Sequence, residues 1–389
     1  MHDGVRESVH AGVGMKATAR PRLLLHIGTH KTATSTLQLL MSSQRKALAA
    51  QGFCYPRTDR EPSPNRNKHA FFRPLVAKGG PSFERMHGAL MEEFAASGCH
   101  TMVLSAEGLA EFPLHRNLNS LSIFARDFDI EAICYVRRQD YFAESLWNQR
   151  CKTGKQTQPI AHFVEDPKVI QYMTYMDMLD RWAAYGKVTA LGFETAREAG
   201  IVESFAAVTG MALPDPEKIR NISPSMTLAA ALAVLNRTKD KQRDWQVLEP
   251  MLGENLSRHA LGSRLRAEIL ARFADHNARL AETYGVVFPD TMPEERPDPL
   301  PDPDPGVIAY LKSEYDRRAA LVAEEAVVQR VARQARRVAR MAAAEGAGDD
   351  AGDVALRARS ERRSARQAEK RAKASATGKR GTKAKIVPV

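Results

Sequence analysis

The sequence predicts an α/β protein in which a central parallel sheet is flanked by helices and followed by a helical C-terminal extension. Short apolar runs at 22–27, 101–105, 131–136 and 187–193 alternate with stretches of helical periodicity such as 139–152 and 171–185. Alternation of this kind is typical of parallel strands joined by helices. From about residue 224 the pattern becomes helical throughout, and 226–236 and 261–284 are the clearest segments.

Length and composition favour one main domain with appendages. The chain has 389 residues, 43% of them hydrophobic and 26% charged, which is close to the average of globular proteins. Its four cysteines show no spacing that zinc requires, so we expect no metal site. No apolar run reaches the roughly 20 residues of a membrane span, and no signal-peptide pattern opens the chain, so we expect a cytoplasmic protein.

Composition shifts predict the domain boundaries. We expect a flexible N-terminal extension over 1–20, a catalytic domain over 21–292, a Pro/Asp-rich linker over 293–305, a helical extension over 306–345 and a basic disordered tail over 346–389. The net charge of +11 belongs almost entirely to that tail, because 354–389 holds twelve Lys or Arg and two Glu. The other residues therefore carry a net charge close to zero, and the basic character belongs to the tail rather than to the folded body.

A phosphate-binding loop is predicted between the first strand and the helix beginning near residue 34. The stretch from Gly28 to Thr36 carries Lys31 and then a cluster of hydroxyls, at a helix start where backbone amides and the helix dipole favour an anion. It is not a Walker A loop, because the lysine precedes the hydroxyl cluster and only one glycine is present. The alternative is an ordinary helix cap beside a surface cation.

This loop resembles the 5′-phosphosulfate loop of sulfotransferases, in which lysine precedes Ser/Thr, Gly and a pair of Thr/Ser. The matching residues, which the resemblance makes cofactor-binding together with Thr36, are Lys31, Thr32, Ala33, Thr34 and Ser35. The family has glycine where this chain has Ala33. If the loop needs a positive φ at that position, alanine costs about 1 kcal/mol.

A second motif follows the strand at 131–136. Arg137 comes directly after the strand, and Ser145 lies eight residues later on a helix. Sulfotransferases use this spacing to grip the 3′-phosphate of their cofactor, and a guanidinium suits that role. Arg138 is an alternative ligand with a spacing of seven. The run 136–149 also resembles the bacterial carbohydrate-sulfotransferase branch, and the resemblance extends over roughly 22–290.

The resemblance implies a P-loop NTPase-like fold and a sulfotransferase that moves a sulfuryl group from 3′-phosphoadenosine 5′-phosphosulfate (PAPS) to a hydroxyl of a carbohydrate or glycoconjugate, without a metal. It assigns stabilisation of the leaving group to Lys31. Glu107, His69 and His30 are the candidates for the base or for a contact with the sulfate. Asn221 and Ser223 are candidate nucleotide contacts, although polar residues before a helix are more often caps.

Two other functions stay open. A phosphoryl-transfer enzyme is the first, and it is disfavoured because no predicted strand ends in an Asp placed to hold Mg²⁺ beside the loop. The second is a polyanion-binding protein that acts through the basic tail, against the simpler interpretation of a solubilising charge run. The tail is also a candidate for contact with a polyanionic acceptor.

Overall fold

The strand β1 (Arg22–Gly28) lies at the centre of a five-stranded parallel sheet in the computed structural model of the chain, which describes residues 20–57, 68–111, 118–215, 223–238, 244–253, 256–294 and 296–345. The other strands are β2 (Phe53–Cys54), β3 (Thr101–Ser105), β4 (Asp129–Val136) and β5 (Lys187–Gly192). Their order is β2-β3-β1-β4-β5, and every pairing is parallel. The predicted α/β class is therefore confirmed.

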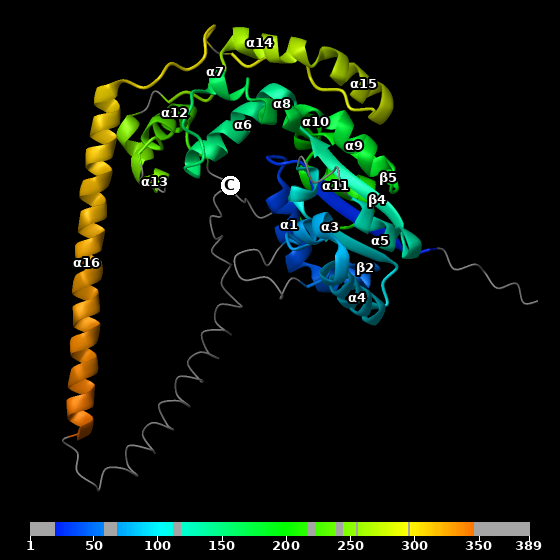
Figure 1. Cartoon of the computed structure of the whole chain (residues 1–389), viewed down its shortest axis with the longest axis horizontal. Coiled ribbons are helices and arrows are strands. Elements are labelled where there is room, and N and C mark those ends of the chain that lie inside the picture. The colour runs from blue at the N-terminus through cyan, green and yellow to red at the C-terminus, as the bar shows by residue number, and fades with distance from the viewer. Residues whose placement is uncertain are drawn as a thin grey trace, which may run out of the picture. The chain divides into compact units, whose positions relative to one another are not determined.

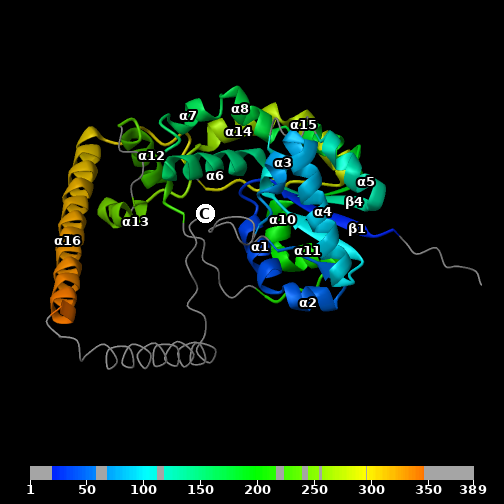
Figure 2. The ribbon, with the colours of Figure 1, turned by 60° about the horizontal axis from the view of Figure 1, so that its bottom comes forward.

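Helices join the strands and cover both faces of the sheet (Figures 1 and 2). The described helices of the first half are α1 (Thr34–Ser43), α2 (Arg45–Ala50), α3 (Phe72–Lys78), α4 (Gly80–Ser97), η1 (Glu107–Ala110), η3 (Asn119–Leu121), α5 (Ser122–Asp127), α6 (Gln139–Lys152), α7 (Ile160–Phe163), α8 (Pro167–Met173) and α9 (Tyr175–Ala183). Those of the second half are α10 (Phe193–Glu198), α11 (Ile201–Thr209), α12 (Met226–Leu235), α13 (Trp245–Leu248), η4 (Glu249–Leu252), α14 (Ser263–Arg272), α15 (Ala274–Tyr284) and α16 (Pro305–Glu345).

The alternation of side chains along β1 separates two apolar cores. Leu23, Leu25 and Ile27 point to one face, where they meet α3, α4, α5 and α9. Leu24 points to the other face, where it meets α1, α2 and α11. Because both faces are covered, the strand is apolar almost throughout, as expected of a buried parallel strand.

The chain divides into two compact units. The first contains the sheet and comprises residues 1–142, 167–216 and 269–292; the second comprises 143–166, 217–268 and 293–389. Within the second unit the carboxylate of Glu144 accepts hydrogen bonds from the backbone amides of Ala260 and Leu261 and pairs with the fully buried Arg266 at 3.1 Å. A buried charge is tolerated there because it is both paired and hydrogen-bonded.

Several predicted helices are interrupted. The helix expected to begin near residue 34 breaks at Gln44, where the hydroxyls of Ser42 and Ser43 donate to the carbonyls of Leu39 and Leu40. Such bonds compete with the helical ladder and bend it. The helix expected over 261–284 breaks likewise at Phe273, between α14 and α15.

The helical C-terminal extension is confirmed, since α16 runs through 41 residues. The described residues of the Pro/Asp-rich stretch before it form no helix or strand, and their backbone hydrogen-bonds to Ala260, Ser263 and Arg264. The basic tail and, apart from Arg20, the predicted N-terminal extension lie outside the described residues. None of the described helices is long and apolar enough to cross a membrane.

Candidate functional site

The loop after β1 begins at the carboxyl edge of the sheet. The neighbouring strands β3 and β4, which flank β1, end at the same edge. In open α/β sheets this is the edge where ligands bind. The loop has positive φ angles at Gly28 (88°), Lys31 (65°) and Ala33 (57°). The loop therefore needs a positive φ at Ala33, and this backbone conformation favours glycine over alanine.

The helix α1 begins within the loop, at Thr34. Ala33 is the residue before the first turn, and no side chain caps the helix. The first amides of a helix have no partner within it, and the positive end of the helix dipole lies there. Lys31, which is half-buried, adds a cation to the same loop. The loop thus combines donors, dipole and charge suited to an anion.

The hydroxyls of the loop divide into two kinds. Thr32 is fully buried and donates to the carbonyl of Thr29 at 2.7 Å. Thr34 is buried and donates to Glu107 Oε2 at 2.6 Å. Ser35 is exposed and Thr36 is half-buried. The first pair shapes the loop in this state, and the second pair is the one within reach of a ligand from solvent.

Glu107 lies directly against the loop. It is the first residue of η1, which follows β3, and a Cβ built on Gly28 would come within 2.9 Å of its Cα and Cβ. Glycine is therefore required at position 28 by close approach as well as by φ. Although no predicted strand ends in an Asp beside the loop, the carboxylate of Glu107 lies there, and this weakens the argument against phosphoryl transfer.

A charged cluster surrounds Glu107. His30 Nδ1 lies 3.8 Å from one carboxylate oxygen and Lys68 Nζ lies 3.7 Å from the other. The second ring nitrogen of His30 lies 2.8 Å from Glu111, which also pairs with Arg73. His30 is therefore held between two carboxylates, and Glu107 between two cations.

These pairs shift the pKa values in opposite directions. Burial alone would raise the pKa of Glu107, but His30, Thr34 and Lys68 outweigh it and lower the value to about 2. Burial alone would lower the pKa of His30, but Glu107 and Glu111 outweigh it and raise the value to about 9. At neutral pH the site thus contains a carboxylate beside an imidazolium.

His69 belongs to the core. Its side chain is fully buried, Nδ1 accepts from the Ser105 amide at 3.0 Å, and Nε2 lies 3.1 Å from the Pro56 carbonyl. The first contact makes Nδ1 an acceptor, so Nε2 carries the proton. Burial lowers the pKa of this ring to about 4. A neutral, doubly hydrogen-bonded ring ties the segment to the end of β3, and this position argues against His69 as the base or as a contact with the sulfate.

Arg137 follows β4 and reaches the phosphate loop. Its guanidinium donates to the Lys31 carbonyl at 3.1 Å, and its Nε lies 3.4 Å from Glu194 Oε1. Phe193 lies below the guanidinium, 5.2 Å from its carbon to the ring centroid. Arg137 and the loop after β1 are therefore neighbours at the same edge of the sheet.

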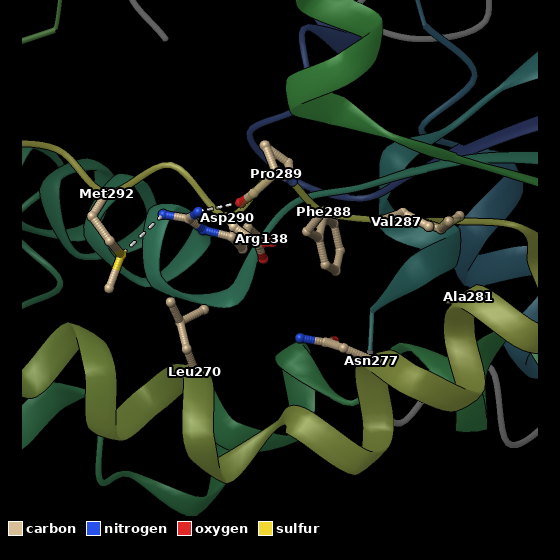
Figure 3. A pocket seen from close by; sticks show the side chains of 10 residues that line it. Arg138, Leu270, Asn277, Ala281, Val287, Phe288, Pro289, Asp290 and Met292 are labelled. Carbon is tan, nitrogen blue, oxygen red and sulfur yellow. Dashed lines mark hydrogen bonds between the residues drawn. The ribbon is translucent and has the colours of Figure 1, made fainter.

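Arg138 is committed to the fold. It is 2% exposed, it forms a forked pair with Asp140, and it donates to the carbonyls of Pro289 and Thr291 and to the sulfur of Met292. These contacts use all five guanidinium donors. Arg138 borders a pocket of about 280 Å³ lined largely by apolar side chains (Figure 3). The alternative of Arg138 as phosphate ligand is disfavoured.

The remaining predicted residues lie outside the first unit. Ser145 is half-buried on α6, and Ser223 is exposed before α12. Asn221 lies outside the described residues. Their roles at the nucleotide stay predictions.

Sequence reasoning missed Lys68, Glu111 and Glu194. Lys68 directly precedes His69, which the sequence had suggested as a site residue instead. Glu111 follows Glu107 by four residues. Helical spacing does not signal Glu111, because η1 is a short turn that ends at Ala110 and the backbone of Glu111 is extended. Nothing in the sequence marks Glu194, which reaches the site only because β5 lies next to β4.

No family model and no curated protein matches this sequence. Among solved structures, the chain is similar to retinol dehydratase in complex with androsterone and the inactive cofactor PAP, at 10% identity and a TM-score of 0.32 over 70% of this chain and 84% of the other. It is also similar to a chain of the PezAT toxin-antitoxin system of Streptococcus pneumoniae, at 11% identity and a TM-score of 0.24 over 70% and 92%. Both similarities are too distant to indicate a function, which is therefore inferred from the residues of this chain.

Proposed function

We propose that this protein is a PAPS-dependent sulfotransferase that acts on a hydroxyl of a carbohydrate or glycoconjugate. One observation supports the proposal most strongly. The loop with Lys31, the carboxylate of Glu107 and the guanidinium of Arg137 come from three neighbouring strands and meet at one edge of the sheet. The resemblance of the loop and of the Arg137 motif to sulfotransferases supplies the reaction and the acceptor class.

The residues fit the donor in chemical type. In the proposal, the amides at the start of α1 and the hydroxyls of Ser35 and Thr36 bind the 5′-phosphosulfate, with Thr32, Ala33 and Thr34 shaping the loop. Arg137 binds the 3′-phosphate, and the nucleotide contacts of Ser145, Asn221 and Ser223 stay predictions. PAPS supplies an activated sulfuryl group with a phosphate as leaving group.

Lys31 and Glu107 divide the chemistry between them. Lys31 places an ammonium beside the leaving phosphate, where negative charge develops. Glu107 orients the acceptor hydroxyl and takes its proton. With a pKa of about 2 it is a weak base. It therefore accepts the proton late, when the forming O–S bond has already made the hydroxyl acidic.

His30 serves as a cation in this scheme. Because its pKa is raised to about 9, it is protonated at neutral pH and does not act as the base. Its position between Glu107 and Glu111 keeps the Glu107 carboxylate ionised and adds positive charge beside Lys31. His69 is excluded from the reaction by its burial in the core.

Phosphoryl transfer is the second candidate, and one contact favours it. A hydroxyl at the start of α1 beside a carboxylate after the neighbouring strand is the arrangement that holds Mg²⁺ in P-loop enzymes, and Thr34 and Glu107 provide it. However, His30 and Lys68 each lie within 4 Å of the Glu107 carboxylate. Two cations at that distance oppose a divalent ion, and this favours sulfuryl transfer.

The test is transfer of labelled sulfate from PAPS to a panel of carbohydrates, run with and without Mg²⁺. Lys31→Ala is expected to lower kcat about 10²-fold or more, and Glu107→Gln by a similar factor. Lys46→Ala, an exposed lysine of α2, is the matched control and should not change the rate. Turnover of ATP that requires Mg²⁺ and fails in Glu107→Gln would instead establish the kinase alternative.

A further inference from the structure

Glu194 is a buried carboxylate beside Arg137, and the chemistry assigned to Lys31 and Glu107 does not use it. It is 6% exposed, and its Oε1 lies 3.4 Å from Nε of Arg137. Its Oε2 accepts a hydrogen bond from the backbone amide of Arg138 at 3.1 Å. Burial raises the pKa of Glu194, and the Arg138 amide and Arg137 only partly oppose the shift. The ionised carboxylate therefore costs folding free energy, which indicates a role other than stability.

The register of the sheet brings Glu194 to Arg137. The last pairing between β4 and β5 joins Val136 to Gly192, and the two strands continue from there into Arg137 and Phe193. Phe193 and Glu194 are the first two residues of α10, which follows β5 directly. Both side chains that contact the guanidinium from this direction therefore come from one turn at the carboxyl end of β5.

Three contacts set the plane of the Arg137 guanidinium. Its Nη1 donates to the Lys31 carbonyl at 3.1 Å, its Nε faces Glu194, and its carbon lies 5.2 Å from the centroid of the Phe193 ring. A guanidinium binds phosphate most strongly through two parallel N–H groups, so the orientation of its plane matters. Ordering a long side chain only on binding reduces affinity. An arginine that is oriented beforehand avoids this cost.

The neighbouring arginine shows a different kind of pair. Arg138 is 2% exposed and forms a forked pair with Asp140 at 2.8 and 2.9 Å. The distance of 3.4 Å between Arg137 and Glu194 is longer, and the Arg137 side chain is 17% exposed. The Arg138 pair holds the fold together. The looser pair orients Arg137 at a place that a phosphate reaches from solvent.

We propose that Glu194 is a positioning residue, which sets the plane of the Arg137 guanidinium for the 3′-phosphate of the nucleotide. The inference rests on the proposed function, because it takes Arg137 as the ligand of that phosphate. In this role Glu194 acts through Arg137 and touches neither the nucleotide nor the acceptor. Its negative charge lowers the attraction of the site for anions in general, so it contributes to selectivity rather than to overall affinity.

The experiment is calorimetric titration of the full-length protein with 3′-phosphoadenosine 5′-phosphate and with AMP. Glu194→Gln keeps an oxygen for the Arg138 amide and places an amide NH₂ group toward Arg137. It should lower the preference for the 3′-phosphorylated nucleotide over AMP by about fivefold, as expected for one long side chain that is no longer ordered in advance. The affinity for AMP should not fall. Glu198→Gln, the same change at an exposed position of α10, should keep the preference.

A second background separates positioning from a general effect on the fold. Arg137→Lys keeps the positive charge but has no planar guanidinium to orient. Adding Glu194→Gln to Arg137→Lys should therefore not lower the preference further, so the two changes are not additive. An equal loss in both backgrounds would show that Glu194 does not act through the guanidinium, and would overturn the proposal.

Glu194→Asp is the second variant. It keeps the charge but withdraws the carboxylate by one methylene group, and it should also lower the preference. Far-ultraviolet circular dichroism establishes that each variant is folded. A preference that is lost in Arg137→Ala but kept in both Glu194 variants would overturn the positioning role and leave the proposed function standing. A wild type without any preference would overturn both.

Discussion

Ala33 occupies a backbone conformation in which glycine is the more stable residue. Its φ of 57° places the Cβ close to a backbone carbonyl, which costs an L-residue roughly 1 kcal/mol. Ala33→Gly is therefore expected to raise the free energy of unfolding by about 0.5–1 kcal/mol in urea titrations. Ala47→Gly, at an exposed helical position of α2, should lower it by a similar amount. Destabilisation by both changes would contradict the left-handed conformation of Ala33.

The raised pKa of His30 should make the free energy of unfolding fall in alkaline solution. A group whose pKa is raised on folding stabilises the folded state fully below its unfolded pKa, and the contribution disappears as pH rises through its folded pKa. For His30 that interval runs from about 6.5 to about 9. The expected decrease in the free energy of unfolding is on the order of 1 kcal/mol, reduced by solvent screening of a partly exposed pair.

His30→Gln removes the titrating group and should flatten this pH dependence, which urea titrations between pH 6 and pH 9.5 would measure. Glu107 acts in the opposite direction, because its pKa is lowered on folding. Its contribution to stability is fully present above about pH 4.5 and is lost as the pH falls toward about 2. An unchanged alkaline slope in His30→Gln would show that His30 is not protonated between its two carboxylates.

At the scale of elements, the contact between the phosphate loop and η1 depends on Gly28. Gly28→Ala combines a positive φ with a Cβ 2.9 Å from the Glu107 backbone. Gly210→Ala is the matched control, since Gly210 has a φ of 77° but no atom within 4 Å of the added Cβ. We expect the control to cost about 1 kcal/mol and Gly28→Ala to cost more, with loss of activity. Equal costs, measured by urea denaturation, would show that the close approach is absent.

Element patterns in the sequence predicted four strands, the phosphate loop and the long final helix. They did not predict β2, because two residues carry no periodicity. Spatial pairings were also beyond reach. Sequence spacing does not reveal that the first residue of η1 meets the first residue of α1, so the Thr34–Glu107 contact was missed. The burial of His69 was missed because a polar residue in a polar stretch resembles a solvated loop residue.

At the scale of the whole molecule, the proposed function depends on how the protein recognises its nucleotide. The first unit brings an anion-binding loop and an arginine together, and the proposal gives the first the 5′-phosphosulfate and the second the 3′-phosphate. A protein built in this way distinguishes nucleotides by the 3′-phosphate. A kinase, in contrast, distinguishes them by the γ-phosphate and Mg²⁺.

Calorimetric titration with 3′-phosphoadenosine 5′-phosphate, beside AMP and ATP, tests this claim most directly. We expect the 3′-phosphorylated nucleotide to bind at least about tenfold tighter than AMP, since a hydrogen bond between charged groups contributes about 1.5 kcal/mol or more. Arg137→Ala should abolish that preference, while Arg197→Ala, an exposed arginine of α10, should keep it. Equal affinity for the three nucleotides, no binding at all, or a preference that survives in Arg137→Ala would contradict the account.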